Sequence, residues 1–114
     1  MRTAEQVFED HLERRAAGDL EGDLRHNYSP DVVLMTGTGI YRGHEGVRES
    51  ADELNEHRGD GTYTYNNKLV DGQHAFLEWS AQGLSTAIND GADSFMIENG
   101  KITVQTIHYT VNEE

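Results

Sequence analysis

The sequence contains no cysteine, which excludes disulfide bonds, thiolate metal sites and a cysteine nucleophile. It also lacks any run of about 18 apolar residues, so no membrane-spanning helix is predicted. The first residues enter a charged helical pattern directly, without the apolar segment of an export signal. We therefore expect a cytoplasmic protein that does not associate with a membrane.

Basic residues are scarce. Nine Lys and Arg stand against 21 Asp and Glu, which gives a formal net charge of −12. A surface of that sign repels the phosphate backbone, so no nucleic-acid partner is expected. With 114 residues, of which 35% are hydrophobic, the chain can build one modest core. We therefore predict a single domain over residues 1–114.

Helical periodicity is confined to the first half of the chain. A capping box formed by Thr3 and Gln6 begins the first helix, and Gly18 ends it. Asp19 can cap a short second helix, which Pro30 prevents from continuing. A narrow apolar stripe on an otherwise charged segment predicts a third, amphipathic helix. The predicted helices cover residues 3–17, 19–27 and 44–57.

The second half of the chain favours strands. A short β-rich segment at residues 31–36 and a possible strand at 40–41 precede a loop at 58–61. Asn99 and Gly100 form the strongest turn signal, because both tolerate the positive φ of a type I′ hairpin. Helices followed by an antiparallel meander predict an α+β fold with the helices on one sheet face. The long predicted strands cover residues 62–70, 74–82, 86–98 and 101–111.

Neither face of the predicted sheet is cleanly polar. In residues 74–82, Leu77 and Trp79 alternate with Phe76 and Glu78, so each face carries large apolar side chains. A broad apolar patch is seldom left exposed on a monomer. We expect one face to pack under the helices and the other to contact a second copy in a homodimer.

Four segments in the same order and spacing resemble the SnoaL-like and ketosteroid-isomerase-like families of the nuclear transport factor 2 superfamily. They are residues 15–22, 28–33, 41–48 and 93–102. The resemblance implies a cone-shaped, curved antiparallel sheet wrapped by three N-terminal helices, a cystatin-like α+β barrel that is usually dimeric. It implies less about the reaction, because one fold carries many activities.

The resemblance also assigns residues to the isomerase site. The position that carries the general base in the isomerases is Thr36 here, and a threonine hydroxyl cannot act as that base. The oxyanion-binding tyrosine falls on His11, and the neutral oxyanion-binding aspartate falls on Asp93. An imidazole can still donate a hydrogen bond or move a proton.

His11 and Asp93 are therefore the candidate proton-handling pair. His11 lies on the apolar stripe of the first helix and should point inward, where a structural core histidine is the alternative. Asp93 alternates with Phe95 and Ile97, and burial of its carboxyl group would raise its pKa. The alternative is that Asp93 is structural, with a backbone or arginine partner.

Glu78 is the third candidate catalytic residue, because a charge in the middle of an apolar strand is seldom buried without a partner. In the aligned register Glu78 and Ser80 face the pocket, and Trp79 faces the partner subunit. A single bulge would exchange the two faces.

The remaining predictions concern the pocket wall, the dimer interface and bound groups. No histidine spacing fits a metal site, and no glycine pattern fits a dinucleotide site, so neither a metal nor a cofactor is expected. The predicted pocket residues are Tyr28, Met35, Thr36, Tyr41, Phe76, Ser80, Phe95, Gln105, Ile107 and Tyr109. The predicted interface residues are Leu77, Trp79, Met96, Val104, Thr106 and His108.

Three functions remain open at this point. The first is a cofactor-free isomerase, cyclase or dehydratase that transfers a proton on a small hydrophobic, oxygen-bearing molecule. The second is a binding protein with the same pocket but no turnover. The third is a dimerisation module whose cone is filled by side chains. A desolvated pair of histidine and carboxylate facing a cavity would favour the enzyme.

Overall fold

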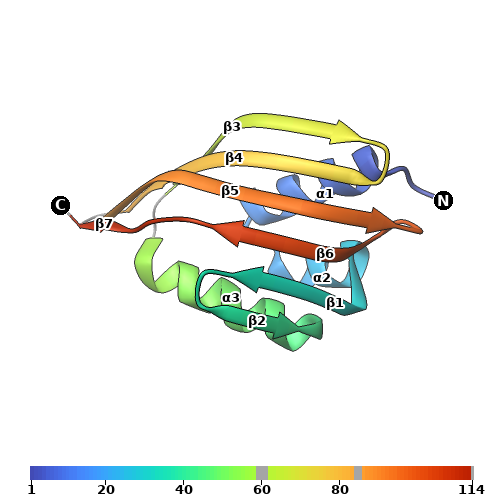
Figure 1. Cartoon of the computed structure of the whole chain (residues 1–114), viewed down its shortest axis with the longest axis horizontal. Helices are drawn as coiled ribbons and strands as arrows, with labels where there is room; N and C mark the ends of the chain where they lie inside the picture. The colour runs from blue at the N-terminus through green and yellow to red at the C-terminus, as the bar shows by residue number, and fades with distance from the viewer. Residues whose placement is uncertain (59–61, 84–85, 114) are drawn as a thin grey trace.

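The computed structural model describes residues 1–58, 62–83 and 86–113 (Figure 1). Residues 59–61 of the predicted loop lie outside the described residues. In the described part the chain forms three helices and seven strands. The helices are α1 (Ala4–Ala16), α2 (Leu20–Asn27) and α3 (Gly43–Arg58). The strands are β1 (Tyr28–Thr36), β2 (Gly39–Arg42), β3 (Thr62–Asp71), β4 (His74–Gln82), β5 (Thr86–Glu98), β6 (Lys101–His108) and β7 (Asn112–Glu113).

The first two helices begin as the sequence predicts. The Thr3 hydroxyl accepts a hydrogen bond from the backbone N–H of Gln6 at 3.1 Å, and the Gln6 side chain accepts one from the Thr3 N–H at 2.9 Å. Gly18 adopts a φ of 75° after the end of α1. Asp19 then caps α2 by accepting a hydrogen bond from the N–H of Gly22 at 3.0 Å.

The strands form one open, curved sheet in the order β2-β1-β6-β5-β4-β3, and β7 pairs with β5. Most neighbours are antiparallel, which confirms the predicted α+β fold. The β1–β6 pair is parallel, so the sheet is not purely antiparallel. In the described residues β2 and β3 do not pair with each other, so the cone stays open at this side rather than closing into a barrel.

Two strand boundaries differ from the prediction. β1 begins at Tyr28 and passes through Pro30, where the pairing with β6 is irregular. Proline lacks the N–H that a regular ladder needs, and this irregularity accommodates it. The last long strand ends at His108 rather than at Val111, and the chain then pairs with β5 through β7.

All three helices lie on one face of the sheet, behind it in Figure 1. We call this face the inner face and the opposite one the outer face. The core between helices and inner face includes Val7, Phe8, Leu12, Leu24, Leu34, Leu77, Ile97 and Ile102. None of the helices in the described part of the chain has the length and apolar character needed to span a bilayer.

Candidate functional site

A cavity of about 50 Å³ lies between α1, α3 and the inner face of the sheet. We call it the inner cavity. Its polar lining consists of His11, Arg15, Tyr63, Tyr65, Asp93 and Gln105. Its apolar lining consists of Leu12, Leu54, Leu77, Trp79 and Ile107. A few polar groups converging in an apolar cleft are typical of small-molecule sites.

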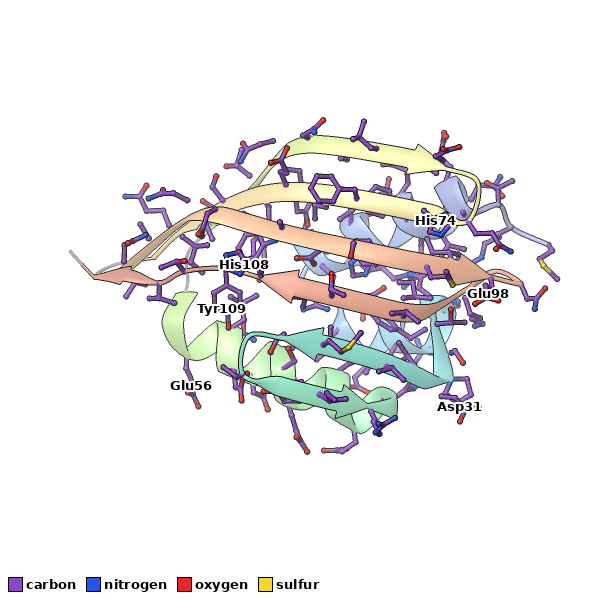
Figure 2. The ribbon with its side chains drawn as sticks, viewed as in Figure 1. Asp31, Glu56, His74, Glu98, His108 and Tyr109 are labelled. Carbon is purple, nitrogen blue, oxygen red and sulfur yellow. The ribbon has the colours of Figure 1, made fainter. Side chains whose placement is uncertain are left out.

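A wider cleft of about 430 Å³ lies beside the inner cavity, and Ile107 lines both. We call it the vestibule. Figure 2 places two of its residues, Glu56 and Tyr109, at the opposite end of the molecule from His74 and Glu98. The vestibule therefore lies next to the inner cavity, at the end of the sheet near β7.

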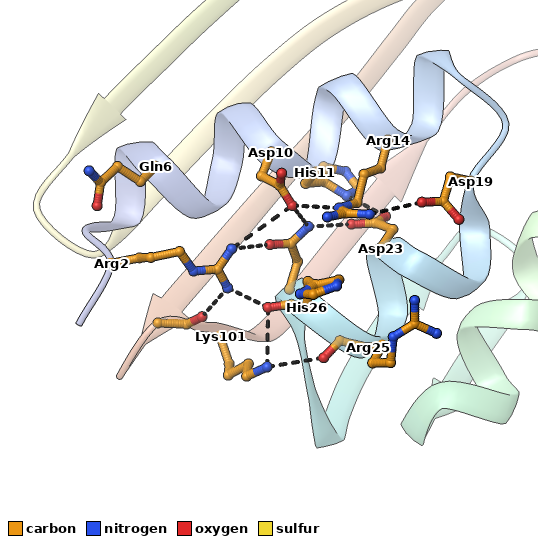
Figure 3. Close-up of polar contacts among 12 residues, drawn as sticks. Arg2, Gln6, Asp10, His11, Arg14, Asp19, Asp23, Arg25, His26 and Lys101 are labelled. Atoms are coloured by element: carbon orange, nitrogen blue, oxygen red, sulfur yellow. Dashed lines mark hydrogen bonds and ion pairs between the residues drawn. The ribbon is translucent and has the colours of Figure 1, made fainter.

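His11 lines the inner cavity and is 3% exposed, which confirms the predicted inward orientation. Its Nδ1 lies 2.7 Å from Oδ2 of Asp23, a fully buried residue of α2 (Figure 3). An ionised carboxylate can only accept hydrogen bonds, so the proton of the neutral imidazole sits on Nδ1. The lone pair is then on Nε2, which forms no hydrogen bond with the described residues.

The other carboxylate oxygen of Asp23 also accepts a hydrogen bond. Asn27 donates its Nδ2 hydrogens to Oδ1 of Asp23 at 2.9 Å and to Oδ2 of Asp10 at 2.8 Å. Asp10 in turn accepts a hydrogen bond from Nε of Arg14 at 2.8 Å. These contacts join α1 to α2 and hold the Asp23 carboxylate against the His11 ring (Figure 3).

Asp93 of β5 lies in the same cavity and has its own partners. Its Oδ1 accepts a hydrogen bond from the indole N–H of Trp79 at 2.8 Å, and its Oδ2 accepts one from the Gln105 amide at 3.2 Å. Burial raises the pKa of this carboxyl group to about 6, although the two hydrogen bonds and the nearby His11 lower it. The predicted pair of His11 and Asp93 is not hydrogen-bonded in the structure. His11 binds Asp23 instead, and Asp93 binds Trp79 and Gln105.

Tyr28 extends the network behind Asp93. Its hydroxyl donates a hydrogen bond to Oε1 of Gln105. Burial raises the pKa of Tyr28 far above its ordinary value, so the phenol keeps its proton and acts as the donor. The Gln105 amide is therefore oriented with its nitrogen toward Asp93.

The predicted facing of β4 is wrong. Trp79 and Leu77 line the inner cavity, whereas Glu78 is exposed on the outer face, where its carboxylate accepts a hydrogen bond from Asn67 at 3.0 Å. Glu78 therefore cannot be a pocket acid, and Leu77 and Trp79 cannot be interface residues. Trp79 fits inward because Gly91 lies opposite it, where an added Cβ would come within 2.3 Å of the indole ring.

Other predicted pocket residues are distributed over several places. Phe76 lines a groove on the outer face, and Ser80, next to Glu78 on the same side of β4, accepts a hydrogen bond from Asn66. Met35 is 41% exposed. These three are outside the pocket because alternation along β4 and β1 turns them away from the helices.

Five other predicted pocket residues lie on the inner side of the sheet, in or beside the vestibule and the inner cavity. Thr36 and Tyr109 line the vestibule. The Tyr41 hydroxyl donates to Glu53 at 2.8 Å instead of lining the inner cavity. Phe95 packs edge-on against the His11 ring and is not among the residues that line the inner cavity. Ile107 lines both spaces, as described above.

Of the predicted interface residues, Met96 and Val104 line the groove on the outer face. The hydroxyl groups of Thr106 and Ser94 form a hydrogen bond on the same face. His108 is largely exposed and lies near Asp90. The structure thus places these four residues on the expected side of the sheet.

Sequence reasoning missed Asp23, Asn27 and Arg15. A signal for them exists in the helical spacing. Asp23 and Asn27 fall on the same helix face as Leu20 and Leu24, and Arg15 follows His11 by four residues. A polar residue on an apolar helix stripe is a candidate for a buried hydrogen-bond network.

The arrangement combines an oriented imidazole, a carboxyl group with a raised pKa and an apolar wall. These are the components of general acid–base chemistry. In the described residues no group of three side chains could hold a metal ion.

The fold and this pocket define a class of small α+β proteins with a cavity under a curved sheet. Residues 8–105 match the model of the SnoaL-like domain, so the chain belongs to the SnoaL-like family. None of the curated protein sequences matches the chain.

Solved structures with low sequence identity share the fold. A proposed ketosteroid isomerase from Kribbella flavida has a TM-score of 0.80 at 14% identity, with 97% of this chain and 80% of that chain covered. A proposed SnoaL-like polyketide cyclase from Mesorhizobium loti has a TM-score of 0.72 at 18% identity, covering 95% and 100%. A protein of the nuclear transport factor 2 type from Burkholderia pseudomallei, of unknown function, has a TM-score of 0.80 at 18% identity, covering 96% and 92%. At these identities the likeness concerns the fold alone.

Proposed function

We propose that this protein is a cofactor-free enzyme that moves a proton on a small, largely apolar, oxygen-bearing molecule in the inner cavity. One observation carries the proposal. His11 is held by the buried Asp23 at 2.7 Å, and its ring lines the same cavity as the buried carboxyl group of Asp93. Burial of two carboxyl groups and an imidazole is unfavourable for folding, and functional sites are where such groups gather.

The three residues have separate roles. Nε2 of His11 is the base that removes a proton from the carbon next to a carbonyl group. Asp23 is a positioning residue, because its hydrogen bond fixes the tautomer and ring orientation. Asp93, when protonated, donates a hydrogen bond to the oxygen on which negative charge develops.

The proton then leaves His11 in one of two ways. Its return to a different carbon of the enolate gives an isomer. Its transfer to a departing hydroxyl group on the neighbouring carbon expels water and leaves a double bond. Both steps balance without an oxidant, a reductant or a cofactor. Isomerases and cyclases named among the structural neighbours support this class of reaction without identifying the substrate.

The base lies on a different element from that of the ketosteroid isomerases. Thr36 occupies the position that carries their general base, and a hydroxyl group has far too high a pKa for this role. In this chain the imidazole of His11 on α1 takes the role instead, supported by Asp23 on α2. This exchange predicts a dependence on α2 that the resemblance alone does not imply.

Exchange of carbon-bound hydrogen for deuterium tests the proposal without knowledge of the natural substrate. A panel of small cyclic ketones and enones is incubated with the protein in D₂O, and exchange next to the carbonyl group is followed by proton NMR. We expect exchange above the buffer rate with wild-type protein. His11→Gln should reduce it by about 100-fold or more, because one general base contributes about that factor.

Asp93→Asn and Glu78→Gln form the matched comparison. Asp93→Asn should slow exchange, since an amide stabilises the developing charge less well than a carboxylic acid does. Glu78→Gln changes an exposed carboxylate on the outer face of the neighbouring strand and should leave exchange unchanged. Exchange that persists in His11→Gln, or is absent with wild-type protein across the panel, would contradict the enzyme and favour a non-catalytic binding protein.

A further inference from the structure

Arg15 has a place in the cavity that the proposed reaction does not use. It lies on α1 four residues after His11, and its side chain is 21% exposed. It lines the inner cavity and also a second small cavity beneath α3. A guanidinium group is costly to bury without partners for its N–H groups.

The guanidinium of Arg15 is short of such partners. It has five N–H donors, yet within the described residues its side chain forms one ion-pair contact, to Asp23 at 3.7 Å, and no hydrogen bond. Arg14, one residue earlier, donates hydrogen bonds to Asp10 at 2.8 Å and to Asp19 at 2.9 Å. Both side chains are half-buried, and Arg15 has fewer hydrogen-bond partners than Arg14.

Asp23 does not satisfy Arg15, because the 3.7 Å between Nη1 of Arg15 and Oδ2 of Asp23 is too long for a hydrogen bond. The oxygens of Asp23 accept closer hydrogen bonds from His11 and Asn27. Arg15 lines the inner cavity, so a molecule bound there is next to a guanidinium group with unused donors. A carboxylate is the group whose two oxygens match the planar fork of a guanidinium. The chain as a whole, with a net charge of −12, repels anions, so attraction of an anion to this cavity has to come from a local cation such as the half-buried Arg15.

We infer that the molecule bound in the inner cavity carries a carboxylate group, which Arg15 binds through its unused N–H donors. The inference deepens the proposed function and rests on it only for treating the bound molecule as a substrate. The carboxylate lies at Arg15, and the apolar body of the molecule packs against Leu54, Leu77, Trp79 and Ile107. The reacting carbon then lies between His11 and Asp93.

The chain carries a reporter for this inference. Trp79 is its only tryptophan and lines the inner cavity, so its fluorescence responds to occupancy. The probes are cyclohexanecarboxylate and its neutral analogue cyclohexanecarboxamide, which differ in charge but hardly in shape. Each is titrated into wild-type protein and into Arg15→Gln, Arg15→Lys and Arg25→Gln.

We expect wild-type protein to bind the carboxylate at least about tenfold more tightly than the amide, the preference that a charge-assisted pair supplies. Arg15→Gln should lose this preference. Arg15→Lys keeps the charge beside Asp23 and should fold, but it should bind the carboxylate more weakly than wild-type protein because the planar fork is gone. Arg25→Gln removes an exposed arginine of α2 and should behave as wild type.

Equal affinity of wild-type protein for both probes, no binding of either, or unchanged carboxylate binding in both Arg15 variants would overturn the inference. The ketone exchange experiment separates it from the proposed function, because neutral ketones carry no carboxylate. Carboxylate binding that depends on Arg15, without ketone exchange, would support the inference and contradict catalysis. Ketone exchange without a preference for the carboxylate would support catalysis and contradict the inference about Arg15.

Discussion

The two faces of the sheet are built from alternate residues of the same strands, yet they differ in kind. On β5, Asp93 and Phe95 face the helices, whereas Ser94 and Met96 face outward. The inner face buries a carboxyl group among apolar side chains, although burial opposes its ionisation. The outer face places its polar groups at the surface. The comparison teaches that unfavourable burial, rather than polarity itself, distinguishes the candidate site.

The outer face nonetheless carries an apolar groove over β3, β4, β5 and β6. A groove of about 370 Å³ is lined by Leu69, Phe76, Met96 and Val104, and Leu69 is 56% exposed. Its lining includes one carboxylate, Asp71, and one histidine, His74, in a chain of net charge −12, so two copies could meet there with little repulsion. The inner face is covered within one chain, and we propose that the outer face is covered by a second copy.

The largest predicted difference concerns neighbouring residues of β4. Leu77 is 3% exposed on the inner face, and Leu77→Ala should lower the free energy of unfolding by about 3 kcal/mol through lost burial and a cavity. Phe76→Ala on the outer face should cost less, about 1 kcal/mol, in dilute protein. Urea denaturation measures both. A larger cost at Phe76 would mean that the outer face is the better buried one.

The second prediction concerns pH. The pKa of Asp93 is raised to about 6 in the folded protein from an ordinary 3.8, so the folded state holds this proton more tightly than the unfolded state does. Stability should therefore fall as pH rises between about 4 and 6, by up to about 3 kcal/mol from this group. Burial causes this upward shift of the pKa, and the groups that face Asp93, which are Trp79 and Gln105 from the sheet and His11 and Arg15 from α1, reduce it.

Asp93→Asn should remove this part of the pH dependence, because an amide does not titrate. Urea denaturation of both proteins from pH 4 to pH 7 measures the difference. A stability difference between the two proteins that stays constant with pH would mean that the Asp93 carboxyl group titrates at its ordinary value.

The third prediction concerns the space for Trp79. In Gly91→Ala the new Cβ would lie 2.3 Å from the indole ring, so the ring or the strand must shift. We expect a loss of about 2 kcal/mol in the free energy of unfolding and a shift of the Trp79 emission maximum. Gly37→Ala is the control, since an added Cβ there meets nothing within 4 Å. Similar stability of both variants would show that the indole does not need Gly91.

The smallest effect on the fold of a single chain is expected for Met96→Lys on the outer face. A lysine there should hinder contact between two copies and leave the inner cavity intact. Sedimentation velocity over a range of protein concentrations should show a dimer for wild-type protein and a monomer for the variant. A monomeric wild-type protein at all concentrations would contradict the proposed dimer.

Much of the fold could be predicted because its signals are local. The capping box at Thr3 and the Asn99-Gly100 turn each involve residues close in sequence, and Asn99 does adopt a positive φ of 52°. The parallel pairing of β1 with β6 was not predictable in this way, since it joins segments far apart in sequence. The end of the last strand at His108 depends on where the chain turns to pair with β5.

The candidate site was harder to predict. Alignment with the isomerases placed Glu78 inward, although the alternation of Ala75, Leu77, Trp79 and Ala81 favoured burial of the opposite side. The apolar side prevailed because burial of four such residues outweighs one charged residue, which reaches water on the outer face. The partner of His11 was missed because Asp23 lies on another helix, and the packing of two helices is not visible in the spacing of either.

The two halves of the site differ in the order in which the growing chain can assemble them. His11 and Asp23 are 12 residues apart, within a hairpin of two helices, whereas the hydrogen bond from Tyr28 to Gln105 spans 77 residues. Contacts between distant residues form late, since a long loop must first be closed. On a ribosome the base and its support can therefore form well before β6 is synthesised. Gln105, which donates a hydrogen bond to Asp93, lies on β6 and is synthesised late. The inner cavity is therefore complete only when the last long strand has joined the sheet.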